Sequence, residues 1–131
     1  MCTLNTVSTS PQTVAADGFV VFDINTVNGC CIKHAEGSTT VVMPKHGKYL
    51  IVFGADVTPT AAGTVQLMNK LVAVPAAAAS FTDVTESHIE FATIIDVAPS
   101  CRCANNTAIL KVQSDVEVVM NNVSLSVLKV M

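Results

Sequence analysis

A large excess of β-branched residues is the feature that most constrains how this chain can fold. Valine, isoleucine and threonine supply 42 of the 131 residues, in 21, 7 and 14 copies. Branching at Cβ restricts χ1 in a helix but packs well on a pleated sheet. No stretch of about 12 residues repeats its apolar positions with a helical period. The sequence therefore predicts an all-β protein.

The composition excludes several classes of protein. Half of the residues are apolar and only 13% are charged, which is the opposite of a disordered chain. The net charge of −3 gives no indication of a basic surface that would bind nucleic acid. No apolar run reaches the ~18 residues of a membrane-spanning helix, and the first residues lack a signal-peptide pattern. We expect no nucleic-acid or membrane partner, and synthesis without a signal peptide.

Short apolar runs alternate with turn residues from Gly18 onward, as in a two-sheet antiparallel sandwich. The clearest alternation runs from His88 to Val97, with Ile89, Phe91 and every second residue after them on one face. Asn121–Asn122 is predicted as a tight turn. The predicted strands are 18–25, 30–34, 38–43, 48–58, 64–69, 71–74, 88–97, 107–114, 116–120 and 123–130. Residues 75–79 are predicted as a coil or flat edge segment, and the polar residues 1–17 as a flexible arm before a domain over 18–131.

Several predicted strands are apolar on both faces, above all 18–25 and 49–57. A two-sheet sandwich buries one face of each strand and leaves the other in water. Apolar surface that remains uncovered marks an interface. We therefore expect the second face to be covered by further copies of the chain.

The five cysteines are an odd number, so at least one is free or paired between chains. A zinc site formed by Cys30, Cys31, Cys101 and Cys103, with His34 as an optional further ligand, is one reading, although the vicinal pair and the C-x-C spacing differ from the usual C-x(2–4)-C. Reduced surface thiols are a second reading, and disulfides that form after release from the cell are a third. The candidates for disulfide or cross-link formation are Cys2, Cys30, Cys31, Cys101 and Cys103.

No catalytic constellation is recognisable in the sequence. There is no G-x-S-x-G motif, and His34, His46 and His88 are scattered along the chain. The carboxylates form no calcium-loop pattern, although a symmetric assembly can place copies of one carboxylate around its axis. We expect no enzyme activity, no cofactor and no assigned metal ligand.

The segment STTVVMPKHGKYLIVFGADVTPTAAGT, residues 38–64, carries a family resemblance. Together with AVPAAAAS, FATIIDV and VMNNVSLSVLKV it resembles the trimeric tumour-necrosis-factor-like (TNF-like) jelly rolls. The bacterial branch is the most similar, in particular the C-terminal domain of the exosporium glycoprotein BclA and related domains of Firmicutes and their phages. The resemblance covers about residues 14–131, without the collagen-like stalk of that branch.

The resemblance implies a jelly roll of about ten strands that forms a tight, non-covalent homotrimer. It also implies a structural or display role rather than catalysis. The positions that match the trimer-facing side chains of the family are Tyr49, Ile51, Phe53, Leu125 and Val127.

Three functions remain open from the sequence. The first is a self-assembling protein of a bacterial spore surface, in an exosporium or appendage-type layer or fibre, attached and cross-linked through its arm by Cys2. The second is a phage head-fibre or capsid decoration protein. The third is a module that binds glycans or receptors, although the chain has no Trp and its single Tyr49 lies in a predicted core strand.

Overall fold

The computed structural model describes residues 2–82, 84–99 and 107–131, and every regular element in them is a β-strand. Within these ranges no helix is long and apolar enough to span a membrane. The all-β prediction is confirmed. The strands are β1 (Thr3–Ser8), β2 (Gln12–Val14), β3 (Ile24–Asn28), β4 (Val41–Met43), β5 (Gly47–Pro59), β6 (Gly63–Asn69), β7 (Val72–Phe81), β8 (Ser87–Val97), β9 (Ala108–Ser114) and β10 (Val118–Lys129).

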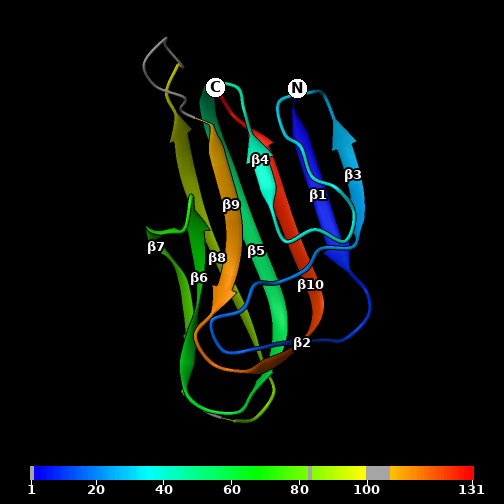
Figure 1. Cartoon of the computed structure of the whole chain (residues 1–131), viewed down its shortest axis with the longest axis vertical. Coiled ribbons are helices and arrows are strands. Elements are labelled where there is room, and N and C mark those ends of the chain that lie inside the picture. Colours follow the sequence, from blue (N-terminus) through cyan, green and yellow to red (C-terminus); the bar gives the residue numbers. More distant parts are fainter. Residues whose placement is uncertain (1, 83, 100–106) are drawn as a thin grey trace.

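The strands form a sandwich of two antiparallel sheets (Figure 1). Sheet A has the order β3-β1-β10-β5-β8, and β2 also pairs with β10. Sheet B has the order β4-β9-β6-β7. Neighbours such as β1 and β10 are far apart in sequence, which is the connectivity of a jelly roll rather than of a simple meander.

Alternating burial explains why these segments are strands. Every second residue of β5 from Tyr49 to Val57 is fully buried, and the residues between them are not. The same period holds in β8, where Ile89 and Phe91 are buried as predicted. In the core Phe53 stacks on Phe91 with ring centroids 5.2 Å apart. Burial of these alternate side chains between the sheets provides the main driving force for folding.

The predicted flexible arm is wrong, because residues 3–14 belong to sheet A. β1 lies between β3 and β10 in the interior of the sheet. Leu4 is 1% exposed, Thr6 is fully buried and Ser8 is 2% exposed. Gln12 in β2 exchanges two hydrogen bonds with the backbone of Val21, at 2.8 and 2.9 Å. The domain therefore begins well before residue 18, and the polar character of Thr and Ser concealed an alternating strand.

Three further predictions of local structure are corrected. Residues 18–23 form no strand but touch the sheets through isolated bridges, such as Phe19 with Gln113. β10 runs through Asn121–Asn122 as one strand, with a register shift there and a positive φ of 52° at Asn122, so this is a bulge and not a tight turn. Residues 75–79 are part of β7, the edge strand of sheet B.

Candidate functional site

The outward face of sheet A carries apolar side chains that the sandwich core does not cover. Side chains alternate along a strand, so the β5 residues between the buried ones point away from the core. Leu50 and Val52 are among them, and Val52 is 39% exposed. Leu50 lies opposite Leu128 of β10 on one side and Ile94 of β8 on the other. These pairs form an apolar band across three neighbouring strands.

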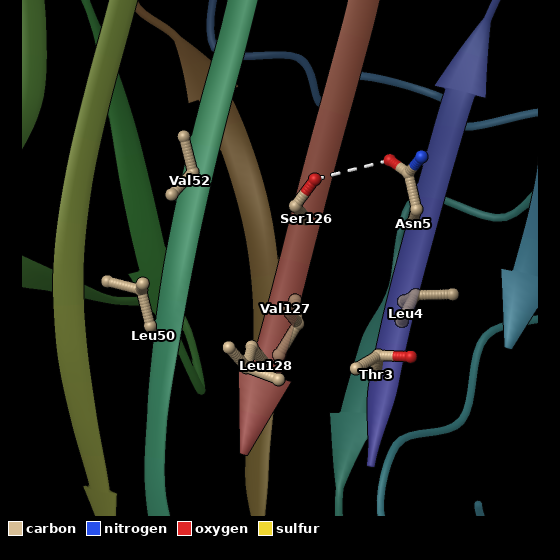
Figure 2. A pocket seen from close by; sticks show the side chains of 8 residues that line it. All are labelled: Thr3, Leu4, Asn5, Leu50, Val52, Ser126, Val127 and Leu128. Carbon is tan, nitrogen blue, oxygen red and sulfur yellow. Dashed lines mark hydrogen bonds between the residues drawn. The ribbon is translucent and has the colours of Figure 1, made fainter. Parts of the chain in front are cut away.

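A shallow groove runs between β1, β10 and β5 on this face (Figure 2). It encloses about 340 Å³. Ser126 bridges two of its strands by donating a hydrogen bond of 3.2 Å to Asn5 Oδ1. The groove is therefore apolar on the β5 side and polar on the β1 side. Its lining residues are Thr3, Leu4, Asn5, Leu50, Val52, Ser126, Val127 and Leu128.

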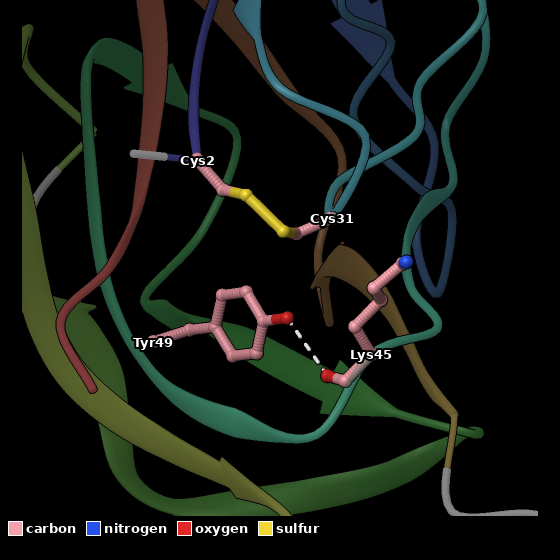
Figure 3. The surroundings of a disulfide bond; sticks show 4 residues. All are labelled: Cys2, Cys31, Lys45 and Tyr49. Carbon is pink, nitrogen blue, oxygen red and sulfur yellow. Dashed lines mark hydrogen bonds between the residues drawn. A yellow bond between two sulfur atoms is a disulfide. The ribbon is translucent and has the colours of Figure 1, made fainter.

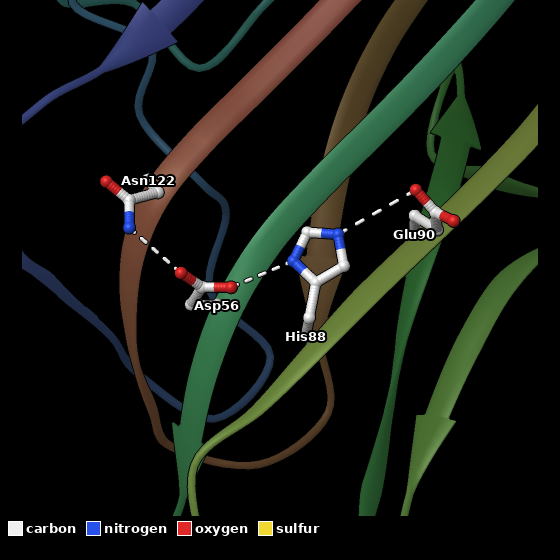
Figure 4. Close-up of polar contacts among 4 residues, drawn as sticks. All are labelled: Asp56, His88, Glu90 and Asn122. Atoms are coloured by element: carbon white, nitrogen blue, oxygen red, sulfur yellow. Dashed lines mark hydrogen bonds and ion pairs between the residues drawn. The ribbon is translucent and has the colours of Figure 1, made fainter.

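A polar cluster lies on the same outward parity, towards the far end of β5 (Figure 4). His88 Nδ1 is 2.8 Å from Asp56 Oδ1, directly across the β5–β8 ladder. His88 Nε2 is 3.7 Å from Glu90 Oε2. Asn122 Nδ2 donates a 2.9 Å hydrogen bond to Asp56 Oδ2. The face thus changes from aliphatic to charged along its length.

The contacts of this cluster favour its charged forms. The hydrogen bond from Asn122 and then that from His88 lower the pKa of Asp56. The hydrogen bond to Asp56, and to a smaller extent the charges of Asp56 and Glu90, raise the pKa of His88. The raised pKa of His88 means that its contribution to stability is fully present below the unfolded-state pKa and is lost as pH rises through the folded value. The lowered pKa of Asp56 means that its contribution is lost as pH falls through the folded value.

The first testable prediction concerns His88. Asp56→Asn is expected to lower the pKa of His88 towards the ordinary value, because it removes the strongest partner of the imidazolium. An NMR titration of the His88 ring protons measures this directly. Glu90→Gln serves as the comparison and is expected to lower the pKa by a smaller amount. A His88 titration that is unchanged in Asp56→Asn contradicts the assigned contact.

A second apolar surface lies where the edge strands of the two sheets meet. β7 of sheet B and β8 of sheet A are in contact. Val72 is 69% exposed and Ile94 is 59% exposed. A shallow cleft of about 300 Å³ separates the two strands here. Its lining residues are Asn69, Val72, Ala73, Val74, Pro75, Ile94, Ile95 and Asp96.

The five residues that the resemblance assigned to the subunit interface point into the core of the chain instead. Tyr49, Ile51 and Phe53 are fully buried, and Leu125 and Val127 are each 1% exposed. They lie in the hydrophobic core between the two sheets of one chain. The parity of these strands is therefore corrected: the larger aromatic and aliphatic set fills the core, and the alternate set faces outward.

The cysteines are placed differently from the predicted cross-link. Cys2 forms a disulfide with Cys31 of the same chain, with Cα atoms 5.7 Å apart (Figure 3). A Cys2 thiol for bonding to a neighbouring subunit is therefore not available in this state. Cys30 is free and exposed. Cys101 and Cys103 lie outside the described residues.

The zinc reading finds no support at His34. Its Nδ1 is 2.6 Å from Asn25 Oδ1 and its Nε2 is 2.9 Å from the Ser38 carbonyl, so both ring nitrogens are engaged. Cys31 is already in the disulfide. Over the described part of the chain, no group of three or more His, Cys, Asp or Glu side chains is placed to hold a metal ion.

The disulfide is expected to stabilise the fold, because it closes a loop of 29 residues between β1 and the segment after β3. Replacing both cysteines, Cys2→Ser with Cys31→Ser, is expected to lower the free energy of unfolding by ~3–4 kcal/mol through loop-closure entropy. Urea denaturation measures the change. Cys30→Ser is the matched control and is expected to leave stability nearly unchanged. Equal midpoints for the double variant and the unaltered chain contradict the pairing.

Comparison with solved structures identifies the fold. Over the full chain and 98% of the other, the structure is similar to the globular domain of zebrafish complement 1qA protein, with a TM-score of 0.68 and 7% identity. It is similar to murine APRIL over 98% of both chains, with a TM-score of 0.68 and 12% identity. It is also similar to PRD1 vertex protein P5 over 99% of this chain and 97% of that one, with a TM-score of 0.61 and 12% identity.

No protein-family model and no curated protein sequence matches the chain significantly. The structural likeness nevertheless covers nearly the whole chain. The chain therefore has the TNF-like, C1q-like jelly-roll fold, as the resemblance implied.

Proposed function

We propose that this chain is a non-catalytic structural protein that assembles as a homotrimer and forms part of a surface layer or fibre of a bacterial spore. The observation that carries the trimer is the uncovered apolar band on the outward face of sheet A, around Leu50 and Val52. Surface of this kind on a weakly charged chain is typical of a subunit interface.

A closed threefold ring needs two different surfaces on each subunit, one to receive a neighbour and one to be received. The chain offers both. The groove between β1, β10 and β5 is concave and apolar on one side. The β7–β8 edge presents Val72 together with Ile94, which lies where this edge meets the apolar band of the outward face. In the proposed trimer the edge of one subunit packs against the groove face of the next.

The small residues of the outward face support close approach of two chains. Gly54 lies beside Ser124 across the β5–β10 ladder, and Val52 lies beside Ser126. A neighbour can approach the sheet closely beside Ser126, whereas the ring of His88 lies over Gly54, with Cε1 3.6 Å from where a Cβ atom of that residue would be. The charged cluster of Asp56, His88 and Glu90 then borders the apolar contact as part of a polar rim.

The spore surface is the finer part of the proposal, and it rests on the sequence resemblance to the exosporium branch of the fold. A virion component is the second candidate, and the similarity to PRD1 vertex protein P5 favours it. Neither candidate requires the N-terminal segment as an arm, since that segment is part of sheet A.

Immunogold electron microscopy tests the location. Antibodies against the purified chain are applied to intact spores and to purified virions of the source organism. Label on the spore surface is the expected result, and label on virions alone selects the second candidate. Detection of the chain only in the soluble fraction, with both particles unlabelled, overturns a surface role.

A further inference from the structure

The lysines gather towards one end of the sandwich. Lys48 lies at the beginning of β5 and Lys129 at the end of β10, where the two strands pair. This is also the end where both chain termini lie (Figure 1). Lys70 and Lys111 lie further along the sandwich and line one shallow pocket together with Ile109. The lysines near the end with the termini are Lys33, Lys45, Lys48 and Lys129, and Asp96 also lies there, directly opposite Lys48.

The opposite end carries carboxylates and, among the described residues, no lysine. Its turns are held by backbone contacts: Thr60 N donates to Glu117 O at 3.1 Å, and Asp17 N donates to Ser114 O at 2.8 Å. Lys48 and Asp56 are eight positions apart on β5, which is about 27 Å at the rise of an antiparallel strand. The carboxylates of this end are Asp17, Asp56, Glu86, Asp115 and Glu117.

The two charged ends lie beyond the two apolar surfaces along the strands, and Asp56 belongs both to the carboxylate end and to the polar cluster that borders the outward face of sheet A. The groove and the β7–β8 edge both run along the strands, on the sides of the sandwich. Three subunits that associate through their sides keep their strands alongside the symmetry axis. All three lysine ends then point one way and all three carboxylate ends point the other, so the trimer multiplies the charge separation of the single chain.

We propose that trimers of this chain stack end to end, with the lysine end of one trimer docked on the carboxylate end of the next. The partner is a second copy of the same assembly, and the inference rests on the proposed trimer. Such a contact is heterologous and does not close on itself, so repetition extends it into a fibre. Three copies of each contact act together, which strengthens an interaction that is weak for one exposed ion pair.

Ionic strength sets the range of this attraction. Each chain has a net charge of −3, which repels other trimers at long range. At about 0.15 M salt the Debye length is ~8 Å, so the opposite charges that meet at the contact outweigh the distant ones. At about 1 M salt the Debye length falls to ~3 Å, and the stack is expected to separate.

Charge reversal provides the test, with free thiols alkylated so that disulfides cannot link chains. Lys33→Glu, Lys45→Glu and Lys48→Glu together make both ends acidic, and Asp17→Lys, Glu86→Lys and Glu117→Lys together make both ends basic. All six side chains are exposed. The unaltered protein is expected to stack at about 0.15 M salt, so that its mass rises several-fold above that of one trimer. Each triple variant alone is expected to remain a single trimer, and a mixture of the two is expected to stack again.

Sedimentation velocity and negative-stain microscopy read the outcome at both salt concentrations. Stacking that returns in the mixture supports the proposal, because each variant then provides the charge sign that the other lacks. Single trimers of the unaltered protein at about 0.15 M salt overturn it, as do stacks that persist in either variant alone. Monomers at about 1 M salt contradict the trimer itself, which separates failure of the proposed function from failure of stacking.

Discussion

Val52→Asp is expected to convert the trimer into folded monomers. Val52 lies in the centre of the outward face of sheet A and borders the groove. A carboxylate there costs little in a monomer, because the position is 39% exposed. In the proposed trimer the carboxylate would be buried against an aliphatic surface without a cationic partner, at a cost of several kcal/mol at each interface. Sedimentation equilibrium measures the mass, and circular dichroism reports the retained fold.

Ile109→Asp is the matched control for this change. Ile109 is also β-branched, lies in a strand and is 36% exposed, but it belongs to sheet B and lies outside both proposed contact surfaces. This variant is expected to stay trimeric. An interface on sheet A is refuted if Val52→Asp remains trimeric, or if Ile109→Asp dissociates to the same degree.

Leu4→Ala is expected to lower the free energy of unfolding by ~2–5 kcal/mol, the usual cost of truncating a buried leucine. Leu4 is 1% exposed and is one of the largest fully buried side chains of the core. The removed methyl groups leave a cavity between β1 and the opposite sheet. Urea denaturation of the Val52→Asp monomer measures the effect without a contribution from assembly.

Val7→Ala is the comparison within the same strand. Val7 has the outward parity of β1 and is only half-buried, so its truncation is expected to cost about 1 kcal/mol or less in the monomer. The contrast between the two positions reports the alternation of a strand. A flexible N-terminal arm predicts equal and small losses of stability for Leu4→Ala and Val7→Ala. That result would contradict the position of β1 in sheet A.

The sequence predicted the central strands well, because their apolar alternation is strong. β8 and β9 follow the expected period, with Ile89, Phe91, Leu110 and Val112 buried. It did not predict β1, where Thr6 and Ser8 occupy inward positions and give the segment the composition of a linker. Short polar side chains fit a buried strand when neighbouring strands cover them on both sides. The amino-acid composition of a segment does not reveal whether such neighbours are present.

The candidate site was predicted only in outline. β5 is apolar on both faces, so uncovered apolar surface could be inferred from the sequence, but which set of side chains stays uncovered could not. Tyr49 and Phe53 take the core because the space between two sheets accommodates their volume, and Leu50 and Val52 are left outside. The contact of His88 with Asp56 depends on the register of β5 against β8, and a sequence contains no direct signal for it.

The native mass of the purified chain in dilute solution tests the central claim most directly. At about 1 M salt, where end-to-end contacts are screened, multi-angle light scattering is expected to give three copies of the 13.7 kDa chain, about 41 kDa. Under the same conditions Val52→Asp is expected to give the mass of one chain. A monomeric mass for the unaltered protein at tens of micromolar would contradict the account, because its apolar outward face would then have no partner.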